Sequence, residues 1–401
     1  MKLIDPIVQW QADMAALRRD LHAHPEIAYE EHRTADVIAA KLEDWGIPHH
    51  RGLGGTGVVG TITGRTSNGP TIGLRADMDA LPMQELNTFE HASKHDGKMH
   101  ACGHDGHMAM LLSAARYLAQ HRDFDGTVHV IFQPAEEGMA GARAMIDDGL
   151  FKQFPMDAVF GMHNWPGLKV GQFAVMPGPM MASSNTFVIN VEGKGAHGAM
   201  PHLGVDPVMV AVQLAQSLQT IVARESDPLE PVVLSITQIH SGSADNVIPT
   251  SAELRGTVRT FNTPTLDMVE QRMEEITKHT VRALNAKADF VFDRRYPPTV
   301  NDATQAAFCA EVMKTIVGAD NVIQDAKPSM GGEDFAFMLN EVPGSYVWIG
   351  NGDGDHRDAG HGMGPCTLHN GSYDFNDDLI PLGASFWVQL ATSWLANPPA
   401  R

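Results

Sequence analysis

A run of eight residues carries one thiol, three imidazoles and one carboxylate: His100-Ala101-Cys102-Gly103-His104-Asp105-Gly106-His107. Thiolate and neutral imidazole are the protein groups that bind zinc-like ions best. Cys102 and His104 stand two residues apart in a predicted loop that leads into a helix, so both side chains could point at one ion. A histidine-rich surface loop is the alternative reading, because His91 and His95 lie nearby. The run therefore raises a metal site as a hypothesis that other parts of the chain must support.

Further acids and a histidine follow strand-like runs along the chain. Asp77 and Asp79, then Glu136 and Glu137, and finally His163 each come at or just beyond the end of an apolar run. Binding sites in open, mainly parallel sheets form beyond the carboxyl ends of the strands. We therefore expect these five side chains at one edge of a sheet.

Each of these groups has a chemical role and a plainer alternative. Glu136 and Glu137 are adjacent and point in different directions, so one could bind a metal while the other accepts a proton from water. Acids at the start of a helix are the alternative. Asp77 and Asp79 point to the same side of a strand, where either could orient a metal-binding imidazole or cap a turn. His369 could be a ligand or an ordinary loop residue.

The elements that would position these residues alternate between helix and strand. Apolar periodicity predicts helices over residues 5–21, 30–45, 108–120, 141–148 and 304–317, and a final helix that ends at residue 397. It predicts strands over residues 58–63, 71–75, 128–133, 158–160 and 346–349. Such alternation predicts an α/β domain with a mainly parallel central sheet and helices on both faces.

The pattern changes after a segment rich in Pro and Gly near residue 178. The next block contains strand, helix, strand, strand, helix and strand, predicted over residues 186–192, 206–223, 232–239, 251–261, 265–284 and 289–292. This β-α-β-β-α-β order is the ferredoxin-like arrangement. We therefore predict a discontinuous first domain of residues 1–183 and 295–401, which contains the candidate metal site, and an inserted second domain of residues 184–294.

Composition excludes several classes of function. The length of 401 residues suffices for two domains. The net charge of −19, with scattered basic residues, argues against a nucleic-acid partner. No apolar run reads as a signal peptide or a membrane span, so we expect no membrane partner. The cysteines Cys102, Cys309 and Cys366 are too few and too widely spaced for a disulfide framework, which favours a cytoplasmic location.

Six motifs in order carry a family resemblance: residues 75–82, 100–107, 133–138, 161–164, 193–198 and 329–334. They resemble the metal-dependent aminoacylases and carboxypeptidases, and most closely the branch of hippurate hydrolase and the plant auxin-conjugate amidohydrolases. The resemblance runs from His24 to His369. It implies a zinc-peptidase-like catalytic domain with an inserted dimerisation or lid domain.

The resemblance also implies a role for each candidate site residue. The implied metal ligands are Cys102, His104, Glu137, His163 and His369. Glu136 would be the general base, Asp79 its companion, and His197 a lid residue that reaches the active site of a neighbouring subunit. The implied substrate-binding residues are Asn246, Arg259 and Gly332.

This chain departs from the wider family at two positions. Asp77 stands where many relatives have a ligating histidine, and Cys102 stands where many have a bridging aspartate. A thiolate favours zinc, whereas oxygen and imidazole ligands also accept manganese, cobalt or nickel. The implied cofactor is therefore a divalent metal, with two ions per subunit, and zinc, manganese, cobalt and nickel all stay open as its identity.

The implied reaction is hydrolysis of the amide bond in N-acyl-L-amino acids, such as hippurate-like N-benzoyl or N-acetyl compounds. Glu136 would move the proton from water to the leaving amine, and His197 would stabilise the oxyanion. Arg259 would pair with the substrate carboxylate, because its planar fork fits both oxygens. A flexible glycine-rich loop around His197 and an exposed strand position for Arg259 are the plainer readings.

Two alternatives to this reaction stay open: a dipeptidase or carboxypeptidase of the same family, and a non-catalytic dimer that holds metal. The β-α-β-β-α-β block leaves an edge strand that two copies could pair, so we expect a homodimer or a dimer of dimers.

Overall fold

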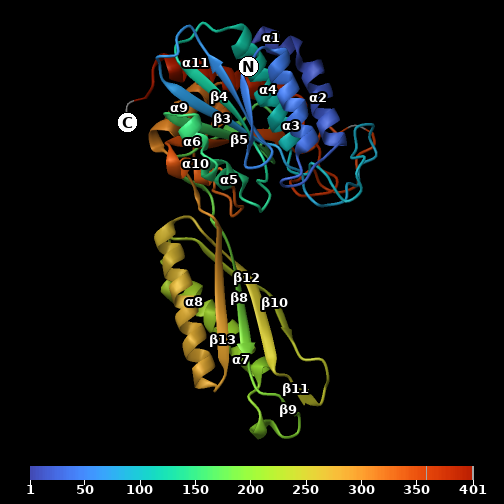
Figure 1. The fold of residues 1–401 in the computed structure, drawn as a ribbon, viewed down its shortest axis with the longest axis vertical. Helices are drawn as coiled ribbons and strands as arrows, with labels where there is room; N and C mark the ends of the chain where they lie inside the picture. Colours follow the sequence, from blue (N-terminus) through green and yellow to red (C-terminus); the bar gives the residue numbers. More distant parts are fainter. Residues whose placement is uncertain (358, 400–401) are drawn as a thin grey trace. The chain divides into compact units, whose positions relative to one another are not determined.

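The computed structural model describes residues 1–357 and 359–399. The chain divides into two compact units, both drawn in Figure 1. The first unit comprises Met1–Met180, Val300–Lys327 and Asp334–Arg401, and the second comprises Met181–Thr299 and Pro328–Glu333.

An eight-stranded sheet forms the centre of the first unit, in the order β1-β2-β4-β3-β5-β16-β6-β15. The four central strands β4, β3, β5 and β16 run parallel to one another, whereas β1 and β2 at one side and β6 at the other add antiparallel pairings. The strands are β1 (His49–Leu53), β2 (Gly57–Thr63), β3 (Thr71–Asp77), β4 (Thr127–Gln133), β5 (Ala158–Pro166), β6 (Phe173–Ala174), β15 (Val322–Ile323) and β16 (Gly344–Gly352). The prediction of a mainly parallel central sheet is confirmed.

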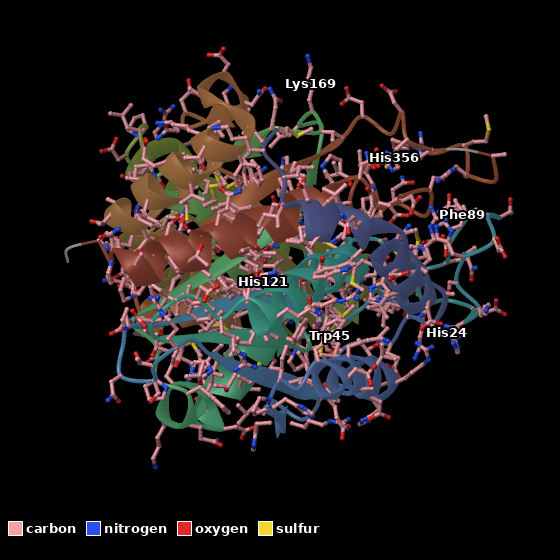
Figure 2. All side chains as sticks on the ribbon, turned by 90° about the horizontal axis from the view of Figure 1, so that it is seen from above. His24, Trp45, Phe89, His121, Lys169 and His356 are labelled. Carbon is pink, nitrogen blue, oxygen red and sulfur yellow. The ribbon has the colours of Figure 1, made fainter. Side chains whose placement is uncertain are left out.

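The helices of the first unit are α1 (Asp5–Gln9), α2 (Gln11–Ala23), α3 (His32–Asp44), α4 (His104–Gln120), α5 (Gly141–Asp147), α6 (Leu150–Gln153), α9 (Ala303–Val317), α10 (Ala336–Glu341) and α11 (Leu379–Ala396). Residues of α2, α3, α4, α9 and α11 share one hydrophobic core with the sheet. Figure 2 shows α4 and α11 next to one another in the middle of this unit.

Helix α11 is long and apolar enough, by length and composition, to cross a membrane, with a mean hydropathy of 1.2. The expectation that no run of the chain has these properties was therefore wrong. Within the fold 78% of this helix is buried, as in the core helix of a globular domain.

Several element ends differ from the predicted ones. The predicted helix over 108–120 begins four residues earlier, at His104, because Gly103 adopts a left-handed conformation (φ 89°) that starts the helix there. The predicted strand over 158–160 continues to Pro166, because parallel pairing with β16 satisfies its backbone across a glycine and several polar residues. The predicted helix over 5–21 is interrupted at Trp10.

The second unit contains a four-stranded antiparallel sheet in the order β10-β12-β8-β13. Its elements follow one another as β8 (Ser184–Glu192), α7 (Pro207–Thr220), β10 (Val232–Ser241), β12 (Ser251–Thr260), α8 (Thr263–Ala283) and β13 (Lys287–Tyr296). Alternate residues of β8 are buried, among them Phe187, Ile189 and Val191, and they share one hydrophobic core with residues of α7 and α8. This is the predicted β-α-β-β-α-β order.

Shorter strands complete the two units. They are β7 (Gly178–Met181), which pairs with β14 (Thr299–Asn301), and β9 (Ala196–His197), which pairs with β11 (Val247–Ile248).

Candidate metal centre

The candidate site of the first unit begins where the chain enters α4. A Cβ atom at Gly103 would lie 2.3 Å from Asn164 Nδ2 and 2.4 Å from Tyr373 Oη, so a side chain does not fit there. This glycine lets the chain turn between Cys102 and His104, which are both buried. The turn places the thiol before the helix and the imidazole on its first residue.

The thiol of Cys102 faces the imidazole of His163. Cys102 Sγ lies 3.3 Å from His163 Nε2. His163 Nδ1 lies 2.6 Å from the backbone oxygen of Asn164, to which it donates, so the lone pair of this ring is on Nε2. The two atoms that would bind a metal therefore point toward each other.

The ring of His104 is oriented in a similar way. Its Nδ1 donates to the backbone oxygen of Asp79 at 2.8 Å, which leaves Nε2 as the nitrogen that could bind a metal. Nε2 is buried and has no hydrogen-bond partner among residues 1–357 and 359–399. A buried polar atom without a partner costs about 1–3 kcal/mol. A bound cation would remove that cost, so this nitrogen fits a metal ligand.

Glu137 and His369 bring the remaining predicted ligands to the same place. His369 Nε2 lies 3.2 Å from Glu137 Oε1. The backbone N–H of Glu137 donates to Asp79 Oδ2 at 2.9 Å, so Asp79 holds both His104 and Glu137. Ligand atoms of Cys102, Glu137 and His369 lie within 4.8 Å of one another.

The adjacent acid Glu136 also belongs to the cluster. Ligand atoms of His104, Glu136 and Glu137 lie within 4.8 Å of one another. Both acids follow Ala135, which has a positive φ of 53° and whose N–H donates to the buried Glu31 at 2.9 Å. The two adjacent carboxylates therefore both lie at the candidate centre.

The charges of the centre favour a cation. Burial alone would lower the pKa of His104, but Asp77 and Asp79 outweigh it and raise this pKa to about 10. Burial, assisted by the charge of Glu137, raises the pKa of the Cys102 thiol. In the protein without metal, protons thus occupy positions where a divalent ion would supply positive charge instead. The donor set of one sulfur, three imidazoles and a carboxylate fits such an ion.

A second set of converging atoms has a different explanation. Asp77, His104, His107 and His163 also have potential ligand atoms within 4.8 Å of one another. However, His107 Nδ1 lies 2.6 Å from Asp77 Oδ1, and His107 Nε2 accepts from the backbone N–H of Asn164 at 3.0 Å. Both ring nitrogens of His107 are therefore engaged, and we assign it to the support of the centre.

Sequence reasoning missed several buried residues that support the site. Arg75 donates to Asp77 at 2.7 Å, to Gln133 at 2.8 Å and to Asp334 at 3.1 Å. These three partners stand in the motifs over 75–82, 133–138 and 329–334, which was the available signal. Glu31 had no such signal, since its partner Ala135 lies more than a hundred residues away in the chain.

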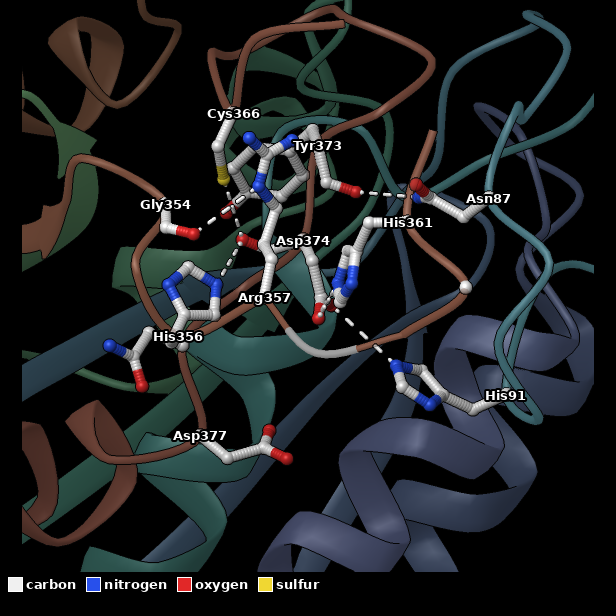
Figure 3. A network of polar contacts seen from close by, with 12 residues as sticks. Asn87, His91, Gly354, His356, Arg357, His361, Cys366, Tyr373, Asp374 and Asp377 are labelled. Atoms are coloured by element: carbon white, nitrogen blue, oxygen red, sulfur yellow. Dashed lines mark hydrogen bonds and ion pairs between the residues drawn. The ribbon is translucent and has the colours of Figure 1, made fainter. Parts of the chain in front are cut away.

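The loop that carries His369 is fixed by a polar network (Figure 3). Asp374 accepts hydrogen bonds from Arg18 at 3.0 Å and from His361 at 3.1 Å. The backbone oxygen of Tyr373 accepts from Asn87 at 3.0 Å. Phe89 and His356, labelled in Figure 2, lie on the two loops that meet in this network.

The other four predicted site residues belong to the second unit. His197 is exposed in β9, and it lines an open hollow together with Asn246. Arg259 is half-buried in β12, and its guanidinium would lie 3.1 Å from a Cβ atom added at Gly332. Burial and the charge of Arg295 lower the pKa of Arg259. The structure therefore groups these residues in pairs, and their roles stay predictions.

Comparison with known proteins places this geometry in a family. Residues 73–393 match the profile of the peptidase family M20/M25/M40. The chain is 38% identical over 395 residues to a hippurate hydrolase of Campylobacter jejuni, covering 98% of this chain and 100% of the relative. It is 42% identical over 347 residues to an N-acetyl-L-cysteine deacetylase of Bacillus subtilis, covering 86% of this chain and 82% of the relative.

A solved structure agrees with these matches. The YXEP protein of Bacillus subtilis, a dinuclear metal-binding peptidase of the M20 family, superposes with a TM-score of 0.83 and 34% sequence identity, covering 97% of this chain and 99% of that one. A match over most of the length, with the same fold and with buried metal-binding side chains in place, establishes that the chain belongs to the peptidase family M20/M25/M40.

Proposed function

We propose that this protein is a metal-dependent amidohydrolase that cleaves N-acyl-L-amino acids into a carboxylic acid and a free amino acid. The observation that carries the proposal is a cluster of potential metal ligands with a second acid, Glu136, beside it. The ligands are Cys102, His104, Glu137, His163 and His369. The hippurate hydrolase and the N-acetyl-L-cysteine deacetylase to which the chain is similar support this class of substrate.

The five converging residues would hold divalent metal, and we propose two ions per subunit, because a dinuclear metal-binding relative shares the fold. When bound, such ions polarise the amide carbonyl and make water more acidic. Zinc, manganese, cobalt and nickel are all compatible with these donors.

The proton steps belong to Glu136. Glu136 is 7% exposed, and its carboxylate lies within 4.8 Å of ligand atoms of His104 and Glu137. It would take the proton of the attacking water and deliver it to the nitrogen of the leaving amine. A positioned base of this kind contributes about 10²–10⁴-fold in rate. Asp79 holds the neighbouring backbone of Glu137 and thereby the direction of both acids.

The second unit would recognise the rest of the substrate. Arg259 would bind the free carboxylate through its planar fork, close to the backbone of Gly332. His197 and Asn246 would contact the amide carbonyl, and His197 would donate to the oxyanion in the active site of a neighbouring subunit. We therefore also propose a homodimer or a dimer of dimers, acting on a small substrate in the cytoplasm.

The two alternative functions are less well supported. A non-catalytic metal-holding protein would be expected to have lost the base or a ligand, and this chain retains Glu136 and all five ligands. A dipeptidase or carboxypeptidase would use the same centre, so only substrate tests separate it from an amidohydrolase.

One experiment tests the proposal at both levels. The protein is dialysed against a chelator, reconstituted with Zn²⁺, Mn²⁺ or Co²⁺, and assayed on N-benzoyl, N-acetyl and indole-acetyl amino acids and on dipeptides. We expect no activity without metal and preferential cleavage of N-acyl amino acids with it. Full activity in metal-free protein, or cleavage of dipeptides alone, would contradict the proposal.

A further inference from the structure

Asn164 lies behind the candidate metal centre and contacts three segments that carry ligands. It directly follows His163 in β5. Its Nδ2 donates to the backbone oxygen of Cys102 at 2.7 Å, and its Oδ1 accepts from the hydroxyl of Tyr373 at 2.8 Å. Tyr373 lies in the loop of His369, and the N–H of that histidine donates in turn to the backbone oxygen of residue 101 at 2.8 Å. One amide group thus connects β5, the turn before α4 and the C-terminal loop.

The orientation of Asn164 is itself fixed by His107. The backbone N–H of Asn164 and its Nδ2 both lie 3.0 Å from His107 Nε2. His107 Nδ1 is engaged by Asp77 at 2.6 Å, so Nε2 is the acceptor. Asp77 is held by Arg75 at 2.7 Å. The four residues Arg75, Asp77, His107 and Asn164 are buried, so solvent water does not compete for their hydrogen bonds.

The side chain of Asn164 also explains the glycine at the start of α4. A Cβ atom at Gly103 would lie 2.3 Å from Asn164 Nδ2, closer than any real Cβ contact. The turn that separates Cys102 from His104 is therefore packed directly on the amide. Moving or removing the amide would free this turn and change the separation of the two ligands.

We propose that Asn164 is a positioning residue of the metal centre, which holds Cys102 opposite His163 and ties the loop of His369 to both. It does not bind the ion. The proposal rests on the proposed function only in taking these three residues as metal ligands. Partners that orient ligands in this way are worth about 10–100-fold in metal affinity.

The test compares Asn164→Ala and Asn164→Asp with a matched control. Asn164→Asp keeps the acceptor for Tyr373 but removes the donor to Cys102. Asn301→Ala is the control, since Asn301 is also buried and makes three side-chain hydrogen bonds, to Met176, to Tyr346 and from Tyr346. Affinity for Zn²⁺ and Mn²⁺ is measured by competition with a chromophoric chelator. Binding of Co²⁺ is followed through the thiolate charge-transfer absorption of Cys102.

We expect both Asn164 variants to lose about 10–100-fold in metal affinity and to shift or weaken the Co²⁺–thiolate band. The control should keep wild-type affinity and the wild-type band even if its melting temperature falls. Tyr373→Phe removes only the hydroxyl that holds Asn164, so it should fold and change the same two readouts in the same direction, by a smaller factor.

Two outcomes would overturn the inference. If Asn164→Asp and Tyr373→Phe bind metal with wild-type affinity and show the wild-type Co²⁺ band, Asn164 has only a structural role. If the control loses affinity equally, the effect is general destabilisation. A wild-type protein that binds no divalent ion would instead overturn the proposed function, and this result is distinguishable from the other two.

Discussion

His129 provides a quantitative test of the fold that is independent of the metal centre. It lies in β4, is 6% exposed, and its Nδ1 is 3.1 Å from Thr61 Oγ1, with the ring of Phe154 at 5.2 Å between centroids. Burial lowers the pKa of His129 from 6.5 to about 4, because the charged ring would lose its hydration. The folded protein therefore requires the neutral ring.

The sign of the pH dependence follows from proton linkage. Between pH 6.5 and 4 the unfolded chain binds more protons at His129 than the folded chain. The contribution of His129 to the free energy of unfolding is therefore fully present above pH 6.5 and is lost as the pH falls toward 4. The whole shift corresponds to about 3 kcal/mol. At pH 5, about 2 kcal/mol of this would already be lost relative to pH 8.

The assay is urea unfolding of metal-free wild type and His129→Gln at pH 8 and at pH 5. Glutamine cannot ionise in this range and can still hydrogen-bond to Thr61. We expect the free energy of unfolding of the wild type to fall by about 2 kcal/mol more than that of the variant. His121→Gln, at an exposed ring, controls for the loss of a histidine as such. Equal losses in wild type and His129→Gln would refute the reasoning.

Three further predictions concern the proposed reaction. Glu136→Gln should retain metal and lose at least about 100-fold in turnover, whereas Glu137→Gln should lose metal. Elemental analysis measures the metal content of both variants, and kinetics measure their turnover. If Glu136→Gln lost metal and Glu137→Gln kept it, Glu137 would be the base and Glu136 the ligand. Arg259→Lys should raise KM at least about tenfold, since a lysine cannot make the paired contact, and an unchanged KM would exclude Arg259 from carboxylate binding. His197→Ala and Glu136→Ala should each be nearly inactive alone and recover up to about half of the activity per mixed dimer on co-expression; confirmed mixed dimers without activity would show that His197 does not act across subunits.

The meeting of Asp79 and Glu136 was predictable because the central strands of the sheet run parallel to one another. In β3 and β4 the register pairs Asp77 with Gln133, so the ends of the two strands lie side by side. The residues that follow each strand, Asp79 and Glu136, must then meet at one edge. Strand-end position and residue type thus sufficed to group these acids with His163 before any coordinates were known.

The supporting residues could not be predicted in this way. The start of α4 depends on Gly103, where Asn164, about sixty positions further along the chain, leaves no room for a side chain. The role of His107 depends on the partner of each ring nitrogen, which spacing does not reveal. Local sequence carries no record of such long-range contacts, although the motifs marked several of the residues involved.

The charges of the ligands bear on how many ions the centre holds. Asp77 stands where the family resemblance implies a ligating histidine, yet its two oxygens are engaged by His107 and Arg75. The anionic ligands would then be Cys102 and Glu137, whose two negative charges would balance one divalent ion when the thiol is ionised. A second ion needs further negative charge, which nearby acids or a carboxylate substrate would supply. We therefore expect the first ion to bind more tightly than the second, and titration of metal-free protein with Mn²⁺ should show two unequal affinities; two equal ones would contradict this charge argument.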